Sequence, residues 1–227
     1  MITKEFLKLL SLMTPITDKA IIKSPVTTLN SESVDILVNL KTDFEVENPI
    51  CIFELSKFLN LLNLFENYDL SIESNKIIIS NTQTKSVFTL GSIDVMEDYN
   101  KSSEIIDRID LAETVSKFTL KAKDMIDFKK SANIFSELNT IDFIGKDTST
   151  YVELGVYNKY NSSNNTFSKE YLSSAQKQFK VSINIDSFLK LPNCDYEVCV
   201  KYNASKNAYR ILFKTELFTI AVSTINV

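Results

Sequence analysis

Residues 51–90 decide the fold, and they read CIFELSKFLN LLNLFENYDL SIESNKIIIS NTQTKSVFTL. The apolar and polar pattern of this stretch predicts a strand, a short helix and three further strands. A similar unit returns about 130 residues later in the chain. Thirty residues separate Phe58 from Phe88, and the same interval separates Phe188 from Phe218. Repetition of a whole supersecondary unit indicates a duplicated architecture.

Four amphipathic helices are predicted, because apolar residues recur there at helical spacing on one side. They cover residues 3–13, 56–65, 123–135 and 186–191, and Ser56 is the expected N-cap of the second helix. Strands are predicted at about 19–23, 26–29, 34–40, 50–54, 68–73, 76–80 and 85–90, and again at 115–121, 140–144, 150–157, 178–184, 195–202, 207–213 and 216–223. Val34 is expected to be the first inward residue of its strand, where apolar and polar residues alternate.

The acidic stretch 91–110 interrupts this pattern, and we expect an irregular connector there that contains the domain boundary. The predicted N-terminal domain is therefore 1–108, with the connector from about 91, and the predicted C-terminal domain is 109–227. Residues 158–170 are expected to form a polar loop. Few, dispersed helices beside many strands argue against a doubly wound parallel sheet. They favour an α+β fold with two similar domains, mainly antiparallel sheets and the helices on one face.

The composition argues against catalysis. The 227 residues include no His, the usual general base at neutral pH, and only 3 Gly, too few for a glycine-rich phosphate-binding loop. Cys51, Cys194 and Cys199 do not have metal-ligand spacing, so they are interpreted as reduced, mostly buried thiols. We therefore expect no cofactor and no metal site.

Acidic residues in the connector are the remaining candidates for an enzyme that uses carboxylates alone. Glu97 and Asp98 are adjacent, and Asp107 and Asp110 are three positions apart. Charge runs in connectors are usually solvated surface, so that interpretation is favoured. No apolar run approaches the ~20 residues of a membrane span, so we expect a cytoplasmic protein without membrane contact.

Every predicted helix carries lysine on its polar side. The candidate functional residues of these helices are Lys4, Lys8, Lys57, Asn60, Lys123, Lys129, Lys130 and Lys190. The net charge of −4 can thus divide into a basic helical face and an acidic remainder. Any amphipathic helix keeps its lysines in solvent, which is the simpler explanation. The duplication favours the interpretation that these lysines form a functional surface, because it would place all four helices on the same side of a sheet.

The chain resembles the DNA polymerase sliding clamps, and most closely the clamp of T-even-type bacteriophages. The matching stretches are 52–62 (IFELSKFLNLL), 73–79 (ESNKIII), 121–125 (KAKDM) and 179–196. The similarity is spread over nearly the whole chain, and the length agrees with that family. It rests on hydrophobic pattern and spacing more than on an invariant motif.

The resemblance implies a homotrimeric ring of six domains, in which the helices line a central hole and the sheets form the outer wall. Such a ring encircles double-stranded DNA without reading its sequence and tethers the replicative DNA polymerase. A clamp loader ATPase opens and closes it, and the clamp itself has no active site. Lysine suits a sliding protein, because its hydrated point charge on a flexible stem attracts phosphates without fixed geometry.

Partners of these clamps usually bind through a short hydrophobic peptide near the interdomain connector. The resemblance thereby implies a partner pocket formed by Ile93, Val95, Met96, Ile105, Ile106, Ile225 and Val227. The alternative is that these side chains pack the domain interface. The connector departs from the family, because it is long, acidic and without proline. A viral tail or baseplate β-sheet protein is the alternative for the whole chain, although it does not explain a lysine on every helix.

Overall fold

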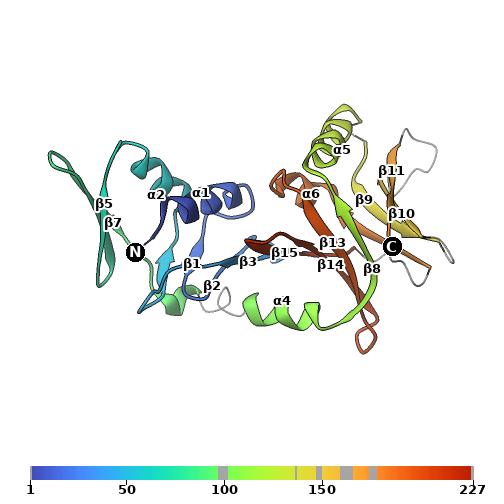
Figure 1. The fold of residues 1–227 in the computed structure, drawn as a ribbon, viewed down its shortest axis with the longest axis horizontal. Coiled ribbons are helices and arrows are strands. Elements are labelled where there is room, and N and C mark those ends of the chain that lie inside the picture. The colour runs from blue at the N-terminus through green and yellow to red at the C-terminus, as the bar shows by residue number, and fades with distance from the viewer. Residues whose placement is uncertain are drawn as a thin grey trace. The chain divides into compact units, whose positions relative to one another are not determined.

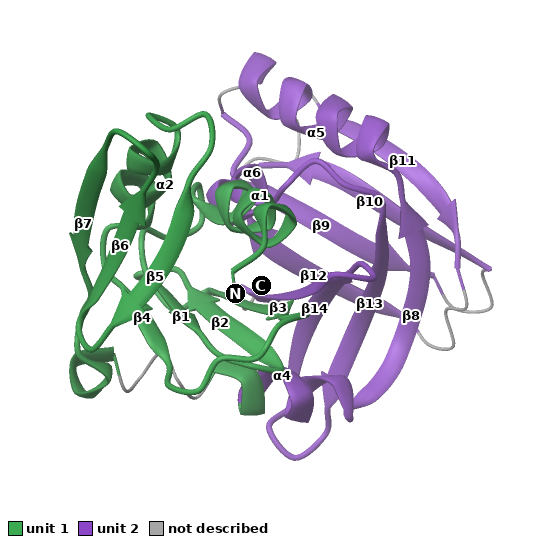
Figure 2. Ribbon diagram, turned by 60° about the vertical axis from the view of Figure 1, so that its left-hand side comes forward, with its two compact units in different colours: residues 1–104 green, residues 105–227 purple. Residues whose placement is uncertain are grey.

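The computed structural model describes residues 2–96, 102–135, 137–146, 150–158, 166–173 and 178–225. The chain divides into two compact units, Met1–Glu104 and Ile105–Val227 (Figure 2). Each unit contains antiparallel strands and a pair of packed helices. No helix within these ranges is long and apolar enough to cross a membrane.

Unit 1 contains one helix followed by three strands, and then a strand, a helix and three strands. The first group is α1 (Lys4–Met13), β1 (Ala20–Ile22), β2 (Val26–Asn30) and β3 (Ile36–Lys41). The second group is β4 (Ile50–Ile52), α2 (Leu55–Leu62), β5 (Asp69–Glu73), β6 (Lys76–Ser80) and β7 (Lys85–Thr89). Within the unit the strands lie in the orders β4-β1-β2-β3 and β5-β6-β7. The 3-10 helix η1 (Ile93–Met96) follows, and α4 (Ser102–Asp110) begins in this unit (Figure 1).

Unit 2 contains two complete copies of strand, helix and three strands. The first copy is β8 (Glu113–Leu120), α5 (Ala122–Ile134), β9 (Thr140–Gly145), β10 (Tyr151–Tyr157) and β11 (Phe167–Leu172). The second is β12 (Phe179–Asn184), α6 (Ile185–Lys190), β13 (Tyr196–Asn203), β14 (Ala208–Lys214) and β15 (Phe218–Ser223). Their sheets have the orders β11-β10-β9-β12 and β15-β14-β13-β8. Each sheet therefore joins three strands of one copy to the first strand of the other.

The repeat predicted from the phenylalanine spacing is present in the structure. Phe58 in α2 and Phe188 in α6 are both fully buried. Phe88 and Phe218 lie in the third strand after the respective helix, and both are buried as well. The rings of Phe58 and Phe88 are 5.1 Å apart between centroids, so helix and closing strand share one apolar core.

The helices form where sequence periodicity places large apolar side chains against the sheets. In α1, Phe6, Leu10 and Met13 are almost completely buried. Thr3 is the N-cap of α1, and its hydroxyl accepts a hydrogen bond from the Phe6 N–H at 3.1 Å. Burial of each such apolar side chain contributes about 1.5–3 kcal/mol, so the core face rather than helix propensity holds these short helices.

Two predictions near the starts of elements are wrong. Val34 has a φ of 56° and is exposed in a turn, so β3 begins only at Ile36. The turn is held by Ser31, whose hydroxyl accepts from the Ile36 N–H at 3.0 Å. Ser56 is not an N-cap, because α2 already begins at Leu55. Its N–H instead donates to Asp18 Oδ1 at 2.6 Å.

Two segments expected to be irregular are ordered elements. Ser102–Asp110 of the acidic connector forms α4, which buries Ile106 and fixes its start through a hydrogen bond from Ser102 to Asn30 at 3.0 Å. Residues 167–170 of the predicted polar loop belong to β11 (Phe167–Leu172), which pairs with β10 along its whole length. The contact that fixes α4 comes from a residue 72 positions away, whereas β11 is held by the strand that precedes it in the chain.

Candidate nucleic-acid interface

Two pairs of helices carry the lysines predicted to face DNA. In unit 1, α1 packs against α2, and in unit 2, α5 packs against α6. Each helix turns its apolar residues toward the core of its own unit, so its polar residues lie on the other side. Within unit 2, α5 and α6 lie on one side of the β13–β15 sheet and α4 lies on the opposite side (Figures 1 and 2).

In unit 1 the predicted residues Lys4, Lys8, Lys57 and Asn60 are all exposed. The Lys57 ammonium lies 3.1 Å from a Glu54 carboxylate oxygen, but both side chains are largely in solvent. Such an exposed pair contributes little and exchanges readily for another anion. Lys4 lies 5.8 Å from the centroid of the Tyr68 ring. Lys8 has no ion-pair partner among the residues described.

In unit 2, Lys123 and Lys130 are exposed on α5, and neither forms an ion pair within the described ranges. The acidic residue of the first turn, Asp124, is buried instead of solvated. Lys169 of β11 binds its carboxylate at 2.5 Å. Because Asp124 is neutralised from the sheet side, the exposed side of α5 keeps its positive charge.

Lys129 and Lys190 lie differently from the other candidates. Lys129 is half-buried, and its ammonium donates a hydrogen bond to the carbonyl of Leu191, the C-cap of α6. Burial lowers the pKa of Lys129, as expected for a cation withdrawn from water. A cation at a helix C-terminus is favourable, so Lys129 ties α5 to α6. Lys190 is half-buried in the last turn of α6.

Basic residues outnumber acidic residues on the four helices. They contain seven lysines, and their acidic residues are Glu5, Asp124, Asp127 and Asp186. Since the whole chain has a net charge of −4, the remainder is acidic. Flexible, solvated lysines on regular helices attract a polyanion without selecting a sequence, because they meet phosphates and not base edges.

The residues predicted to form a partner pocket are separated by the structure into surface and core. Val95 of η1 is 72% exposed and Ile93 is partly exposed. Met96 is fully buried against Ile21, Cys51 and Phe53, so it is a core residue of unit 1.

The remaining residues of that prediction follow the same division. Ile105 on α4 is exposed, whereas Ile106 beside it is buried. Ile225 is half-buried, and its N–H donates to the Ser182 carbonyl at 2.8 Å. Val227 lies outside the described residues. Met96 and Ile106 are therefore buried, and Met96 packs within unit 1.

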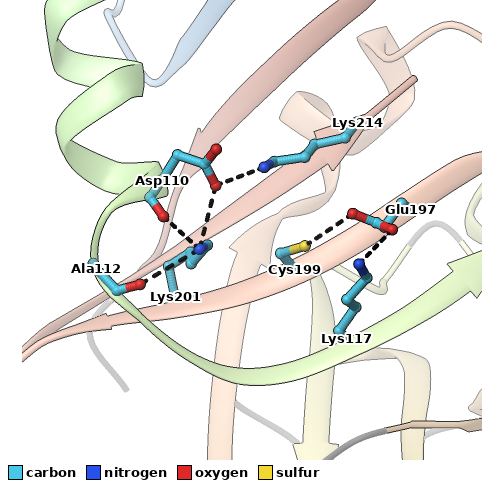
Figure 3. A network of polar contacts seen from close by, with 7 residues as sticks. All are labelled: Asp110, Ala112, Lys117, Glu197, Cys199, Lys201 and Lys214. Atoms are coloured by element: carbon cyan, nitrogen blue, oxygen red, sulfur yellow. Dashed lines mark hydrogen bonds and ion pairs between the residues drawn. The ribbon is translucent and has the colours of Figure 1, made fainter. Parts of the chain in front are cut away.

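The carboxylates considered for catalysis do not converge in the described part of the chain. Asp110 binds Lys214 at 2.6 Å and Lys201 at 3.2 Å (Figure 3). Burial alone would raise the pKa of Asp110, but Lys214 and Lys201 together hold it below its usual range. Asp107 is exposed, and Glu97 and Asp98 lie outside the described residues. No group of three potential metal ligands occurs among the residues described.

The cysteines are free thiols in the core or near it. Cys51 and Cys199 are buried, and Cys194 is half-buried. Burial raises the pKa of the Cys199 thiol, and the nearby Glu197 carboxylate acts in the same direction. A thiol with a raised pKa forms little thiolate, so Cys199 has the properties of a packing residue rather than a nucleophile.

Sequence reasoning missed one site in unit 2. A pocket of about 500 Å³ lies between α4 and the β13–β14 hairpin, and both Arg108 and Arg210 line it. These are the two arginines of the whole chain, which is the sequence signal that could have drawn attention to them.

Comparisons with known proteins identify the fold. No protein-family model matches the chain, and no match is found among curated protein sequences. Among solved structures, the proliferating cellular nuclear antigen of Entamoeba histolytica matches with a TM-score of 0.66 and 17% identity, over 97% of this chain and 95% of that one. PCNA of A. fulgidus, solved with the C-terminal region of FEN-1 bound, matches with a TM-score of 0.64 and 9% identity, over 97% and 95% of the two chains.

A bacterial relative of that fold matches over part of its length. The Helicobacter pylori beta clamp, solved with a DNA ligase peptide bound, gives a TM-score of 0.65 and 11% identity. The match covers 98% of this chain and 65% of the beta clamp. At these identities the likeness concerns the fold and not the function. This chain has the α+β fold of the DNA sliding clamps.

Proposed function

We propose that this protein is a subunit of a ring-shaped sliding clamp that encircles double-stranded DNA and tethers a replicative DNA polymerase. The observation that carries the proposal is the presence, on a sliding-clamp fold, of exposed helix lysines that form no ion pair with any described residue. Lys8 in unit 1 and Lys123 and Lys130 in unit 2 are those lysines. Each occupies the side of its helix that faces away from the core of its unit.

The physical logic of a clamp agrees with this distribution. A closed ring remains on DNA by topology, so each lysine–phosphate contact can be weak and screened by salt. Weak contacts allow sliding, whereas bidentate arginine contacts would hold the phosphates in place. A clamp acts mechanically, and therefore needs neither a cofactor nor a metal.

The ring is proposed to be a homotrimer, as the sequence resemblance implies. β7 ends one sheet of unit 1 and β11 ends one sheet of unit 2, within the strands described. Open sheet edges of this kind can pair between subunits, and a heterologous contact of fixed rotation closes into a ring. Resemblance to the clamps of T-even-type bacteriophages further suggests viral DNA replication as the setting, with a clamp loader ATPase as the second partner.

Native mass spectrometry and negative-stain imaging of the full chain test the proposal. A mass of three times 25.8 kDa and a ring with a central hole are expected. A stable monomer would contradict the ring. A hexamer or a filament would favour a viral structural protein, the alternative considered for this sequence.

Retention on DNA provides the functional test. Protein bound to nicked circular DNA should remain on it during gel filtration at moderate salt, and it should be released when the circle is cut once. Equal retention on circular and linear DNA would mean that binding is not topological, and the clamp proposal would then fail.

A further inference from the structure

The strand that follows each of the helices α1, α5 and α6 has a neighbouring strand on both sides. β1 lies between β2 and β4, β9 lies between β10 and β12, and β13 lies between β14 and β8. β5, which follows α2, pairs with β6 alone among the described strands (Figure 2). The second neighbour of β13 is β8, the strand that precedes α5, whereas no described strand precedes α1. One edge of β5 is therefore open where the repeat in unit 2 holds a strand.

The open edge leaves apolar side chains of β5 partly uncovered. Ile77 and Ile79 of β6 are fully buried, and register partners in a ladder lie on the same face of the sheet. Their partners in β5 are Ile72, which is 48% exposed, and Leu70, which is half-buried. Val200 of β13, the strand with two neighbours, is fully buried. An edge strand also presents backbone N–H and C=O groups that can pair with another chain.

A pocket of about 410 Å³ adjoins this edge, and we call it the β5 pocket. Its lining consists of Ile2, residues 44–50, Ile72, Ser74 and Leu90. The segment 44–50 is held to unit 1 at two points. Phe44 packs edge-to-face on Phe6 with 5.0 Å between ring centroids, and the Val46 N–H donates to Ser24 Oγ at 3.3 Å. The wall of the pocket is thus fixed by contacts within unit 1.

The β5 pocket is acidic as well as apolar. Glu45 and Glu47 are exposed, and they alternate with the half-buried Phe44 and Val46. Neither glutamate forms an ion pair with a described residue, and none of the described residues that line the pocket is basic. The pocket therefore offers two carboxylates beside an apolar surface, at the end of an open sheet edge.

We propose that the open edge of β5 and the β5 pocket together bind an extended segment of a partner protein in which basic and aliphatic residues alternate. The backbone of this segment adds a strand to β5. Because side chains alternate between the faces of a strand, its aliphatic residues cover Leu70 and Ile72. A Lys or Arg of the segment reaches the pocket and pairs with Glu45 or Glu47.

Charge and position select this occupant. The carboxylates of Glu45 and Glu47 repel phosphates, which argues against a nucleic acid. β5 and β7 are the two ends of one three-stranded sheet, and the proposed ring contact uses β7. The inference goes beyond the proposed clamp function and does not depend on it, because the open edge and the pocket belong entirely to unit 1.

The test uses the full chain and a fluorescein-labelled short peptide of alternating lysine and valine. The matched probe carries glutamate in place of lysine. Fluorescence anisotropy should show binding of the lysine peptide with affinity about tenfold higher than that of the glutamate peptide. Two further probes are methylated on the backbone nitrogens of either all valines or all lysines. Alternate N–H groups of a strand point to opposite edges, so one methylated peptide should lose binding and the other should retain it.

Charge variants locate the basic end of the segment. Glu45→Gln combined with Glu47→Gln should weaken binding of the lysine peptide about tenfold, because two exposed ion pairs are lost. Glu32→Gln combined with Glu216→Gln is the matched control, since both glutamates are exposed in turns outside the pocket. This control pair should bind the lysine peptide as the wild type does.

An apolar variant locates the added strand. Ile72→Lys should weaken the lysine peptide about tenfold, because it places a like charge where an aliphatic side chain packs. Leu217→Lys is the matched control, since Leu217 is 51% exposed in unit 2 and should have no effect. Thermal unfolding of each variant is measured first, and the Glu45 and Glu47 double variant carries the test if Ile72→Lys does not fold.

Four results would overturn the inference. Equal affinities for the lysine and glutamate peptides would remove the carboxylates from the argument. Equal losses of affinity in the two double glutamate variants would reduce the effect to overall charge. Full binding of both methylated peptides would exclude an added strand. A change of oligomeric state in Ile72→Lys, measured by native mass spectrometry, would make a second copy of this chain the occupant of the edge.

Discussion

Asp195 Oδ1 accepts a hydrogen bond from the Ala122 N–H at 2.8 Å, so a carboxylate that precedes β13 caps the lysine-bearing helix α5. Its second oxygen binds Lys121 at 2.8 Å. Unit 1 contains the same arrangement, because Asp18, which precedes β1, accepts from the Ser56 N–H of α2. In each unit the aspartate precedes the strand that pairs with the strand leading into the capped helix. One copy of the repeat thus orients the helix of the other.

Replacing Asp195 tests this cap. The Lys121 and Ala122 hydrogen bonds hold the pKa of Asp195 below its ordinary value of 3.8 in the folded protein. A lowered folded pKa means that Asp195 stabilises the protein above pH 3.8 and loses this contribution as the pH falls through the folded value. Asp195→Asn should therefore lower Tm by about 2–5 °C at neutral pH, and the difference from wild type should vanish in acid.

Thermal unfolding followed by circular dichroism at both pH values measures this effect. Asp186→Asn is the matched control, because Asp186 is exposed in the first turn of α6 and should contribute less. A Tm difference for Asp195→Asn that persists unchanged in acid would contradict the assignment of the cap to the ionised carboxylate.

Charge reversal on the helices tests the proposed DNA interface. Lys57→Glu combined with Lys130→Glu should lower retention on circular DNA roughly tenfold at low salt, because each lost phosphate contact reduces both affinity and its salt dependence. The ring mass should be unchanged. Lys76→Glu with Lys146→Glu makes the same change of charge away from the four helices, and it should leave retention intact. An equal loss of DNA retention in the two double variants would mean that the helix lysines do not form the DNA interface.

Lys129 and Lys130 are neighbours with different expected roles. Lys129→Met removes the hydrogen bond to the Leu191 carbonyl and should lower the free energy of unfolding by about 1–2 kcal/mol, while DNA retention changes little. Lys130→Met should leave stability almost unchanged and weaken DNA retention. Urea unfolding and the retention assay, applied to both variants, separate the two effects. A loss of stability in Lys130→Met together with a loss of DNA retention in Lys129→Met would exchange the roles assigned to the two lysines.

The paired phenylalanines test the core of the repeat. Phe58→Ala and Phe188→Ala should each cost about 3–5 kcal/mol of unfolding free energy, because each removes a fully buried ring and leaves a cavity. Urea denaturation measures the loss, with Leu64→Ala as a control at a largely exposed position. A loss below about 1 kcal/mol at either phenylalanine would contradict its place in a close-packed core.

Much of the fold can be predicted from local sequence pattern. The spacing of Phe58 and Phe88, repeated at Phe188 and Phe218, locates a helix and its closing strand in both units. The apolar periodicity of α1 predicts which side is buried, because a helix exposes one side to water and must bury the other. These features depend on residues near each other in the chain, and sequence alone determined them.

Other features were decided only by the tertiary structure, because their partners are far apart in the sequence. The helix α4 depends on the burial of Ile106 and on the bond from Ser102 to Asn30, so its acidic sequence did not reveal it. Helical periodicity places Lys129 on the polar side, but the Leu191 carbonyl withdraws its charge from that surface. Arg108 and Arg210 are far apart in the sequence, and the packing of α4 on the β13–β14 hairpin brings both to one pocket. Local periodicity fixes which side of an element is apolar, whereas long-range packing decides which polar groups meet.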